Sequence, residues 1–407
     1  MKTDVVVIGG GPAGLFSAAI AAKKGKKVIL IDKNEVLARK LRITGKGRCN
    51  VTNSADISDF IEMVCSNPTF MYSAFYSFTN QDTIDFFENA GVPLKEERGG
   101  RIFPVSDRAK DIAQALIDYA KNNGVVILTD TVTKVIAKDN VICAVETKNA
   151  RKIECSDVIL ATGGASYPLT GSTGDGYKFA EKLGHSIIKP YPSLIPLVVA
   201  EEYVKDLQGL SLKNVSVKVY KGTKCVYEDF GEMIFTHYGL SGPVILSASS
   251  NLKNIEESNY KISIDLKPAL TFEQLDKRLQ RDFEKYINKN FSNSLNDLLP
   301  TKMIDTIIKL SNIDPFIKVH QISKQQRLNL CALLKGLCFT ITGVRPIEEA
   351  IITRGGINTK EINSSTMESK IIKGLYFCGE VIDVDAYTGG FNLQIAFSTA
   401  YLAGNNV

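Results

Sequence analysis

The sequence lacks the features that mark several common protein classes. Its eight cysteines include no C-x-x-C pair and no Cys/His cluster with zinc spacing, which excludes a close redox thiol pair and predicts no metal site. No low-complexity tract interrupts the 407 residues, and the apolar run from Val5 to Ile8 is too short to span a bilayer. The formal net charge of +5 is small for this length, so charge alone predicts no nucleic-acid partner.

What the sequence does contain is typical of a globular protein. Hydrophobic residues make up 44% and charged residues 23% of the chain, enough to bury a core, and the length suits two or three domains. The first strand begins almost at the N-terminus with no leader-like segment before it, and unpaired cysteines fit a reducing compartment. We therefore expect a cytoplasmic protein without membrane association; the sequence carries no signal for an oligomeric state.

The first thirty-two residues follow a strand, turn, helix, strand pattern. Asp4 to Ile8 is a β-branched run, Gly9 to Gly14 reads G-G-G-P-A-G, Leu15 to Lys24 is Ala-rich and helical, and a second strand from Lys27 to Ile31 ends at Asp32. This order predicts a parallel sheet with a glycine turn at the start of a helix.

The turn contains G-x-G-x-x-G at Gly9, Gly11 and Gly14, with Asp32 eighteen residues beyond. In such a turn the first glycine allows the tight bend, the second lets the backbone approach a pyrophosphate, and the third allows close packing of helix on strand. The helix N-terminus directs N–H groups at the phosphates, and the acid accepts from a ribose hydroxyl. The alternative is a glycine turn that binds nothing, and the motif does not separate NAD from FAD.

Segments far along the chain favour FAD. A strand expected from Lys152 to Leu160 ends in Ala161-Thr-Gly-Gly164, as in FAD proteins of the glutathione-reductase type, after a small meander between Val125 and Thr147. A strand within Gly374 to Glu380 ends at Gly379-Glu380 with Asp383 beyond, which resembles the fingerprint whose acid holds the ribityl chain.

The last segment leads into the C-terminal helix. Gly389 and Gly390 precede an apolar helix from Ile395 to Leu402, so their backbone N–H groups would face a flavin. A helix dipole at that point favours the negative charge of a reduced flavin.

Four longer blocks resemble a known family. They are G-K-G-R-C-N-V-T-N at 45–53, G-G-A-S-Y-P-L-T-G-S-T-G-D-G at 163–176, F-T-H-Y-G-L-S-G-P at 235–243 and M-E-S-K at 367–370. The chain resembles, from end to end, the aminoacetone-oxidase-like flavoproteins, the family that also holds the bile-acid-pathway reductase-like proteins. Departures are Lys46 where the family often has Gly, Asp32 where Glu is commoner, and Cys378 where Ala is common.

The resemblance implies an α/β fold: a split Rossmann-type FAD-binding domain, glutathione-reductase-like, carrying an inserted β-barrel-like and helical domain. Prolines near 190–196 mark the crossing, Val215 to Tyr220 and Lys261 to Leu266 are strand-like, and Thr271 with Gln274 has capping-box spacing. We predict residues 1–190 and 345–407 as the two parts of the FAD domain and residues 191–344 as the insert.

Non-covalent FAD is the expected cofactor, mostly through the resemblance. The residues expected to hold it are Gly9, Gly11, Pro12, Ala13, Gly14, Asp32, Lys33, Lys40, Gly45, Lys46, Arg48, Cys49, Asn50, Thr52, Asn53, Ala161, Thr162, Gly163, Gly164, Gly379, Glu380, Asp383, Gly389, Gly390, Phe391, Asn392 and Leu393.

Three side chains are candidate catalytic groups. His237 lies in the F-T-H-Y-G-L-S-G-P block and can exchange a proton near neutral pH, although a histidine that only fixes a turn is the alternative. Tyr387 is a second proton donor, and Lys46, in a basic stretch, can neutralise an anionic substrate; a packed aromatic and a solvated lysine are the alternatives.

The cysteines are expected to be structural. Cys49 has no partner thiol nearby in sequence and is expected to be a packed small residue. Cys331 and Cys338 are seven residues apart in a helical pattern, which predicts one buried helix face.

No second G-x-G-x-x-G is present for a nicotinamide cofactor, so NAD(P)H, if it supplies electrons, must dock transiently at the flavin. The leading hypothesis is a flavin N5 hydride-transfer enzyme that reduces an activated C=C in a small organic substrate. The alternatives are an amine oxidase of aminoacetone type that uses O2, an RNA-modifying flavoprotein, and a non-catalytic flavin-binding protein. Basic residues of the insert are interspersed with acids, so we expect a small-molecule substrate and no nucleic acid.

Overall fold

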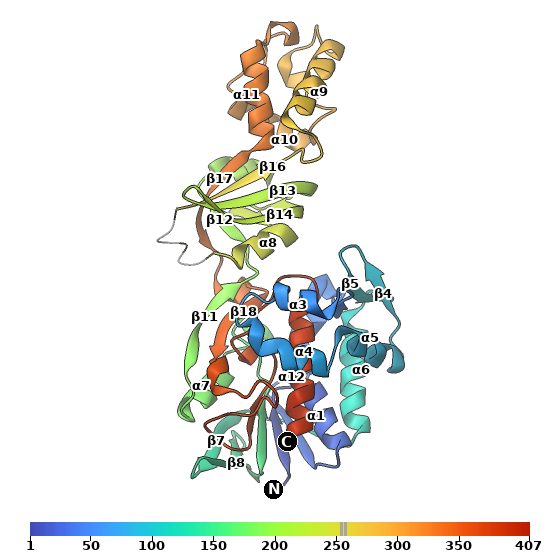
Figure 1. Cartoon of the computed structure of the whole chain (residues 1–407), viewed down its shortest axis with the longest axis vertical. Helices are drawn as coiled ribbons and strands as arrows, with labels where there is room; N and C mark the ends of the chain where they lie inside the picture. The colour runs from blue at the N-terminus through green and yellow to red at the C-terminus, as the bar shows by residue number, and fades with distance from the viewer. Residues whose placement is uncertain (253–254, 256–258) are drawn as a thin grey trace. The chain divides into compact units, whose positions relative to one another are not determined.

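A computed structural model describes residues 1–252, 255 and 259–407. The chain divides into two compact units (Figure 1). The first consists of Met1–Ser193 and Pro346–Val407, and the second of Leu194–Arg345. We call them the dinucleotide unit and the inserted unit.

A parallel sheet forms the centre of the dinucleotide unit. Its strands run in the order β19 (Leu375–Phe377), β10 (Asp157–Leu160), β1 (Val5–Ile8), β2 (Val28–Asp32) and β6 (Val126–Thr129). Val5 pairs with Val28 on one side and Asp157 on the other, so the carboxyl ends of β1, β2 and β10 meet at one edge. The sheet therefore brings residues 9–14, 32 and 161–164 to the same edge.

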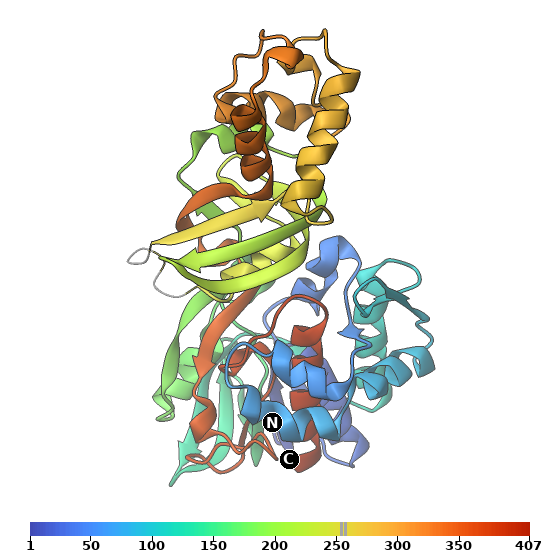
Figure 2. The same cartoon turned by 45° about the horizontal axis from the view of Figure 1, so that its top comes forward.

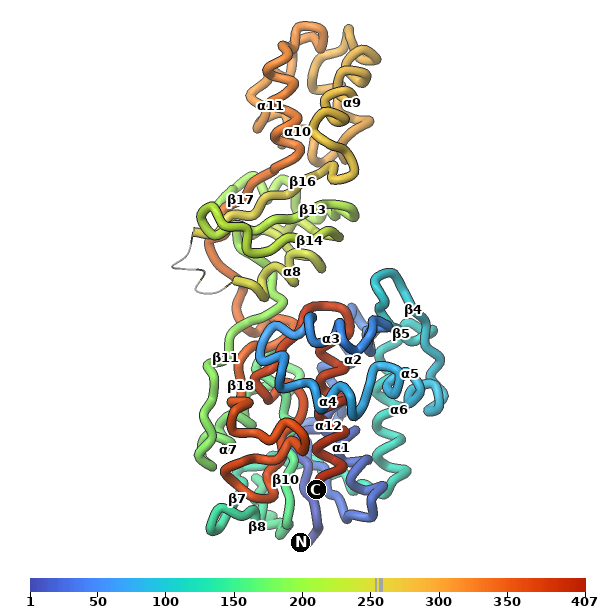
Figure 3. The backbone as a smooth tube through the Cα atoms, viewed as in Figure 1, coloured from blue at the N-terminus to red at the C-terminus, as the bar shows by residue number. Residues whose placement is uncertain are grey.

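Helices from both ends of the sequence pack together beside this sheet. Helix α1 (Pro12–Lys23) lies against α12 (Phe391–Asn406) and α6 (Ala109–Asn122), and the blue and red tubes run together in Figure 3. Phe16 packs its ring against Phe78 and Phe397, with ring centroids 5.0 and 5.7 Å away. Because α1 and α12 share one core, the first and last segments form a single unit.

Smaller sheets complete the dinucleotide unit. They comprise β3 (Thr52–Asn53), β5 (Arg101–Pro104) and β4 (Leu94–Glu97); β7 (Val132–Lys138), β8 (Val141–Thr147) and β9 (Lys152–Glu154); and the pair β11 (Ile187–Ser193) and β18 (Ile352–Ile357). The strand predicted over Lys152 to Leu160 is two strands, because Lys152–Glu154 pairs with β8 whereas Asp157–Leu160 joins the central sheet.

The remaining helices of the dinucleotide unit are α2 (Arg39–Ile43), α3 (Ile57–Met63), α4 (Tyr72–Ser77), α5 (Asn80–Asn89) and α7 (Asp175–Lys182). Short 3-10 turns lie at Thr44–Gly47, Pro68–Met71, Pro168–Thr170, Ile347–Glu349, Thr359–Glu361 and Gly379–Val381.

The inserted unit contains a closed barrel, seen side-on in Figure 2, which confirms the barrel-like prediction. Its strand order is β12 (Leu197–Val199), β15 (Gly239–Ser241), β14 (Lys224–Phe235), β13 (Ser211–Lys221), β16 (Tyr260–Asp265) and β17 (Leu337–Val344). Val215, Val217 and Val219 alternate with exposed or half-buried neighbours along β13 and are buried, as alternation in the sequence predicts. Helix α8 (Pro243–Ser249) packs against β14.

Helices between β16 and β17 form the rest of the inserted unit. They are α9 (Phe272–Lys285), α10 (Thr301–Ser311) and α11 (Lys324–Lys335), with 3-10 turns at Phe291–Asn293 and Val319–Gln321, and a further turn at Glu202–Leu207 beside the barrel. The capping box at Thr271 and Gln274 is present, as predicted. The prediction that Cys331 and Cys338 share a helix face is wrong: α11 ends at Lys335, and Cys338 is exposed on β17, while Cys331 is buried.

Two kinds of feature are missing from the described part of the chain. No helix there is long and apolar enough to cross a membrane. No group of three or more His, Cys, Asp or Glu side chains there is arranged to hold a metal ion.

Candidate functional site

The glycine turn of the dinucleotide unit is shaped by two different constraints. Gly9 has φ +109°, and a Cβ on it would lie 2.5 Å from the carbonyl oxygen of Ala161. A Cβ on Gly14 would lie 1.8 Å from the carbonyl oxygen of Gly9. These two glycines are therefore required by the packing of the turn itself.

Gly11 is different, because a Cβ on it would meet no atom within 4 Å. Its φ of −77° suits any residue, so neither space nor backbone within the chain requires glycine. Gly11 is the N-cap of α1, whose first turn has no side-chain cap and no acidic residue. Free helix N–H groups beside open space suit a phosphate ligand, so the geometry at Gly11 is compatible with the role that the sequence predicts for it.

Asp32 fixes the end of β2 beside this turn. Its Oδ2 accepts a hydrogen bond of 2.6 Å from the Gly10 N–H, and its Oδ1 accepts one of 2.7 Å from the Asn34 N–H. A carboxylate accepts about four hydrogen bonds, so the same group has capacity for a ribose hydroxyl.

Lys33 extends from the same strand end to the T-G-D-G block. Its ammonium donates to Thr173 Oγ1 at 2.5 Å and to Asp175 Oδ2 at 2.6 Å. Burial raises the pKa of Asp175, but the hydrogen bonds from Lys33 and Thr173 outweigh it and the pKa is lowered. Lys33 therefore holds the 171–176 loop against β2.

A polar cluster joins three distant segments at the sheet edge. The Lys40 ammonium binds Glu380 Oε2 at 2.7 Å and Ser166 Oγ at 2.7 Å. Glu380 Oε1 accepts a 2.8 Å hydrogen bond from the Thr353 N–H, and Thr353 Oγ1 accepts one from Ala165. Lys40 and Glu380 were predicted; Ser166 and Thr353 were missed, and the G-G-A-S sequence that contains Ser166 is the signal that pointed there.

Gly163, Gly164 and Gly379 are packed around this cluster. A Cβ on Gly164 would lie 2.4 Å from Thr353 Oγ1, and a Cβ on Gly379 would lie 2.9 Å from Ala13 Cβ. Gly379 has φ +74° and Gly163 φ +71°. The close approach of these backbones explains why the sequence has glycine there.

The 44–50 loop runs through left-handed backbone conformations. Gly45 and Lys46 have φ of 55° and 59°, Gly47 has 85° and Cys49 has 63°. Lys46, which replaces a family glycine, is exposed. Cys49 is fully buried, and burial raises the pKa of its thiol to about 12, so it is a packed residue without thiolate character.

Arg48 directs its side chain toward the β4–β5 hairpin. Its guanidinium pairs with Glu97 and with Asp107 and lies 4.3 Å from the centre of the Phe103 ring. The Arg48 side chain, predicted to contact the cofactor, is therefore engaged by protein groups.

The 50–53 segment is tied to the start of α12. Thr52 Oγ1 donates to Gln394 Oε1 at 2.7 Å, and Asn53 Nδ2 donates to the Gly389 carbonyl at 3.0 Å. A Cβ on Gly390, whose φ is +101°, would lie 2.3 Å from the Thr52 carbonyl oxygen. Helix α12 begins directly after Gly390. Like α1, it has no side-chain cap and no acidic residue in its first turn.

Phe391, Asn392 and Leu393 have structural neighbours. The Phe391 ring packs on Phe60 with centroids 4.9 Å apart, and Leu393 packs against the core. Asn392 accepts from the Ala386 N–H at 2.9 Å and donates to the Tyr387 carbonyl at 3.2 Å, so its side chain fixes the preceding loop.

Five buried polar atoms have no hydrogen-bond partner within the described chain: Asn50 Oδ1, Asp130 Oδ2, Thr147 Oγ1, Thr162 Oγ1 and Tyr177 OH. A buried polar atom without a partner is costly, so Asn50, Thr162 and Tyr177, which lie in or beside the glycine-rich segments, suit a group outside the chain. Burial raises the pKa of Tyr177, which keeps its hydroxyl a hydrogen-bond donor. Asn50 and Thr162 were predicted cofactor residues, and Tyr177 was missed. Together with the open space at Gly11, these atoms fit a bound dinucleotide.

A buried ion pair lies between the sheet edge and α12. Asp385, with 1% of its side chain exposed, pairs with Arg354 at 3.1 Å and accepts from Ser193 Oγ at 2.9 Å. The neighbouring Asp383 accepts from Asn67 at 2.9 Å, and burial raises its pKa. Asp383 was predicted from the sequence, whereas the Arg354–Asp385 pair was not.

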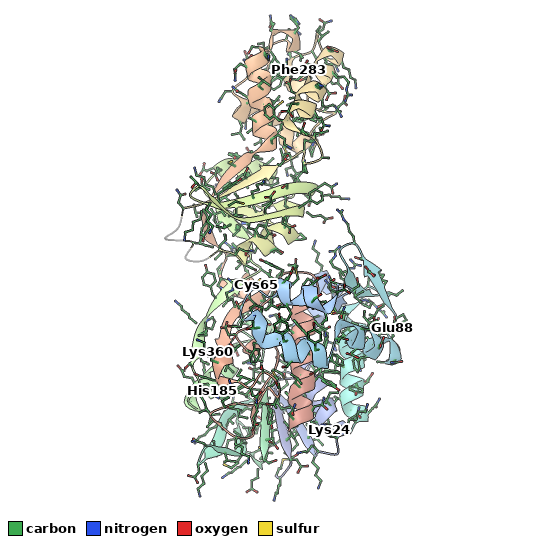
Figure 4. The ribbon with its side chains drawn as sticks, in the orientation of Figure 1. Lys24, Cys65, Glu88, His185, Phe283 and Lys360 are labelled. Carbon is green, nitrogen blue, oxygen red and sulfur yellow. The ribbon has the colours of Figure 1, made fainter. Side chains whose placement is uncertain are left out.

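The catalytic candidates belong to different units. Tyr387, two residues before Gly389, and Lys46 are in the dinucleotide unit, while His237 is in the inserted unit, in the turn between β14 and β15. The His237 ring meets the Tyr238 ring edge-on at 4.8 Å. His185, labelled in Figure 4, is buried between Glu361 and Ser369, as expected of a structural histidine.

The sheet order and the two uncapped glycine-led helices define a Rossmann-type dinucleotide-binding protein. Residues 3–406 match the model of the HI0933-like protein Rossmann domain, so the chain belongs to the HI0933-like family, an oxidoreductase family with a Rossmann-type FAD-binding domain. The predicted flavoprotein family and fold are thereby confirmed.

Relatives match the chain over its whole length. Two proteins named ribosomal RNA dihydrouridine synthase are similar to it: one from Escherichia coli, 31% identical over 100% of this chain and 98% of the relative, and one from Haemophilus influenzae, 33% identical over 98% and 97%. A 3-dehydro-bile acid delta(4,6)-reductase from Clostridium scindens is 30% identical over 98% and 97%. A 3-ketosteroid-delta4-(5alpha)-dehydrogenase from Rhodococcus jostii shares the fold with a TM-score of 0.56 at 13% identity, over 100% of this chain and 96% of that one.

Proposed function

We propose that the chain is an FAD-dependent reductase of a C=C bond conjugated to a carbonyl, with NAD(P)H as the transient electron donor. The observation that carries this proposal is the shared chemistry of the full-length relatives. Dihydrouridine is uridine reduced at the ring C=C beside a carbonyl, and a delta(4,6) 3-dehydro steroid contains a dienone. Both names describe hydride addition to an activated C=C, although the substrates differ.

The residues of the dinucleotide unit support FAD as the group that carries the hydride. The α1 N-terminus with Gly11 would hold the pyrophosphate, Asp32 the ribose, and the Lys40–Glu380 cluster the ribityl side. When bound there, FAD would supply hydride transfer between a nicotinamide and the substrate. The uncapped N-terminus of α12 would stabilise negative charge on the reduced ring.

Reduction of a conjugated C=C also requires a proton for the carbon next to the carbonyl. Tyr387 is the candidate we favour, because it lies two residues before the Gly389–Gly390 start of α12 in the unit that would bind the flavin. Tyr387→Phe should keep FAD and slow turnover. His237→Ala and Lys46→Ala test the other two candidates, and retained turnover in all three variants would remove them from the mechanism.

The cofactor site has its own test. Gly11→Val should fold normally, because its side chain meets no protein atom, yet lose flavin absorbance, because the same side chain fills the pyrophosphate space. Gly343→Val is the matched control: Gly343 also has open space at its Cβ but lies on β17 of the inserted unit. Normal FAD occupancy in Gly11→Val contradicts this placement of the phosphates, and release of FMN instead of FAD contradicts the dinucleotide.

The reaction is tested by anaerobic reduction of the yellow protein with NADH or NADPH. We expect bleaching of the flavin, followed by reoxidation on addition of a cyclohexenone or steroid enone, or of uridine-containing RNA. Rapid reoxidation by O2 with turnover of aminoacetone, and none by an enone or RNA, would instead indicate an amine oxidase. Flavin that no donor reduces would indicate a non-catalytic protein.

RNA is the second candidate substrate, since two full-length relatives are named for a ribosomal RNA product. The chain is 30–33% identical to both kinds of relative, so sequence identity favours neither a uracil ring nor a small enone as the substrate. The choice depends on whether the inserted unit presents a surface for nucleic acid.

A further inference from the structure

The helical part of the inserted unit ends in two segments that pair with each other. Residues 286–290 follow α9 and residues 314–321 precede α11; we call them the helical tip. Asn290 and Lys318 form an antiparallel bridge, and the Val319 N–H donates to the Lys289 carbonyl at 3.1 Å. This pairing fixes the backbone from which the side chains of the tip project.

The tip lies at the end of the helices that is remote from the barrel. Helix α9 begins soon after β16 and α11 ends just before β17, so their other ends point away from the strands, as Figure 1 shows. A 14-residue helix such as α9 spans about 21 Å. The tip is therefore an exposed surface that is not needed to close the barrel.

Two large apolar side chains are exposed there. Phe316 is 75% exposed and Ile287 is 47% exposed. The core beneath is already filled by Phe283, labelled in Figure 4, and by Phe291, so it does not need Phe316. The Phe316 N–H is held by Asp314 Oδ1 at 2.9 Å, which fixes the turn that presents the ring.

Two lysines belong to the same two segments as these side chains. Lys289 lies 4.7 Å from the centre of the Tyr286 ring, and Lys318 is exposed on the facing segment. Among the described residues neither lysine has an ion-pair partner, whereas Lys285 pairs with Asp297 at 2.6 Å. Exposed lysines without an ion-pair partner, on the same two paired segments as an exposed aromatic ring, are groups that bind the phosphates and bases of a nucleic-acid strand.

Charge is also distributed unevenly between the units. Residues 194–345 contain 20 Lys and Arg and 16 Asp and Glu, so the inserted unit contributes +4 of the chain's net charge of +5. Basic and acidic residues are interspersed along its sequence, and for this reason no nucleic-acid partner was expected. Folding gathers unpaired lysines at the tip, an arrangement that composition does not reveal.

We propose that the helical tip binds single-stranded RNA, with a base stacked on Phe316 and phosphates on Lys289 and Lys318. The inference deepens the proposed function and rests on it for the chemistry, because the proposed function includes RNA as a candidate substrate. Stacking on an aromatic ring tolerates any base, so the tip would supply affinity and leave the choice of uracil to the flavin site.

Fluorescence anisotropy of the FAD-loaded full chain with a fluorescein-labelled oligouridine of about 20 nucleotides tests the proposal. We expect Phe316→Ala to weaken binding about tenfold. The double variant Lys289→Glu/Lys318→Glu should weaken it by more than tenfold and reduce the slope of log affinity against log salt by about 1.4, since each lost phosphate contact on a single strand removes about 0.7.

The matched control is Lys213→Glu/Lys277→Glu, which makes the same change of charge at exposed positions of β13 and α9 in the same unit. It should leave affinity within about twofold. Equal weakening by the control and the tip variant would show that only net charge matters and would overturn the site. Absence of binding by the unmodified protein, or binding to vesicles of phosphatidylserine and phosphatidylcholine in place of RNA, would overturn it as well.

Failure of this proposal is distinguishable from failure of the proposed function. Tip variants should retain FAD, thermal stability and reduction of a small enone. RNA binding at the tip without reduction of any C=C would contradict the reductase and leave the tip intact. Enone reduction without RNA binding would contradict the tip alone.

Discussion

Two arginine–carboxylate clusters in the dinucleotide unit use the same chemistry in different surroundings. Arg354 and Asp385 are buried, with 17% and 1% of their side chains exposed, whereas Arg48, Glu97 and Asp107 are 35%, 28% and 43% exposed. Arg48 contacts two carboxylates, those of Glu97 and Asp107, and the Phe103 ring. We expect burial, more than the number of contacts, to decide how much stability is lost when one residue of a cluster is replaced. Water screens the surface pairs and can replace their contacts, but it does not reach the buried pair.

The largest effect should follow removal of one partner of the buried pair. Asp385→Ala removes the buried carboxylate that pairs with Arg354, which costs about 3–5 kcal/mol of the free energy of unfolding. Urea denaturation measures it. The double variant Asp385→Ala/Arg354→Met should be more stable than Asp385→Ala, because it also removes the guanidinium charge that the lost carboxylate balanced. A double variant that is less stable than the single one would show that packing and not charge burial dominates.

The Lys40–Glu380 pair lies between the two extremes, with 19% and 23% of the side chains exposed. Lys40→Met should cost about 2 kcal/mol, since Glu380 keeps its hydrogen bond from Thr353 and part of its hydration. The same variant should weaken FAD binding, measured by flavin release on dilution. Glu380→Gln, which keeps the shape and the backbone hydrogen bond, should be the milder change; if it is the more damaging one, the charge of Glu380 serves the cofactor more than the fold.

His185 extends the comparison to a group whose charge depends on pH. Burial lowers its pKa below its ordinary value of 6.5, against the opposing effect of Glu361. The unfolded chain then binds the proton more readily, so stability rises with pH and is lost as pH falls from 6.5 toward the folded-state pKa, by up to about 1.4 kcal/mol per pH unit. Urea denaturation midpoints measured between pH 5 and 7 for the unmodified protein and for His185→Asn check the direction of this pH dependence. If the variant shows the same dependence of stability on pH, other groups cause it.

The smallest effect is expected at the surface cluster. Arg48→Ala removes both ion pairs and the stacking on Phe103 and should cost at most about 1 kcal/mol, with much of the loss disappearing at high salt. If Arg48→Ala lost as much stability as Asp385→Ala, burial would not explain the difference between the two clusters. FAD content is the second readout, and a normal value would agree with a side chain that faces the β4–β5 hairpin.

Local patterns were sufficient for much of the site. The G-x-G-x-x-G turn, the acid at the end of the next strand and the A-T-G-G segment each follow a short apolar strand, so neighbours in sequence decide their conformation. The same holds for the alternation along Val215 to Val219 and for the capping box at Thr271, which need only adjacent residues.

The pairings across the chain followed from tertiary structure alone. Lys40 and Glu380 are 340 residues apart, and Arg354 and Asp385 meet because β18 and the loop before α12 converge, so no spacing in the sequence reveals either pair. The division of 152–160 between two sheets and the exposure of Cys338 depend on which strand each segment joins. The sequence determined the elements and the kind of ligand, since these depend on periodicity and on glycine. Burial, and with it the strength of each charge pair, was decided only when distant segments packed together and excluded water.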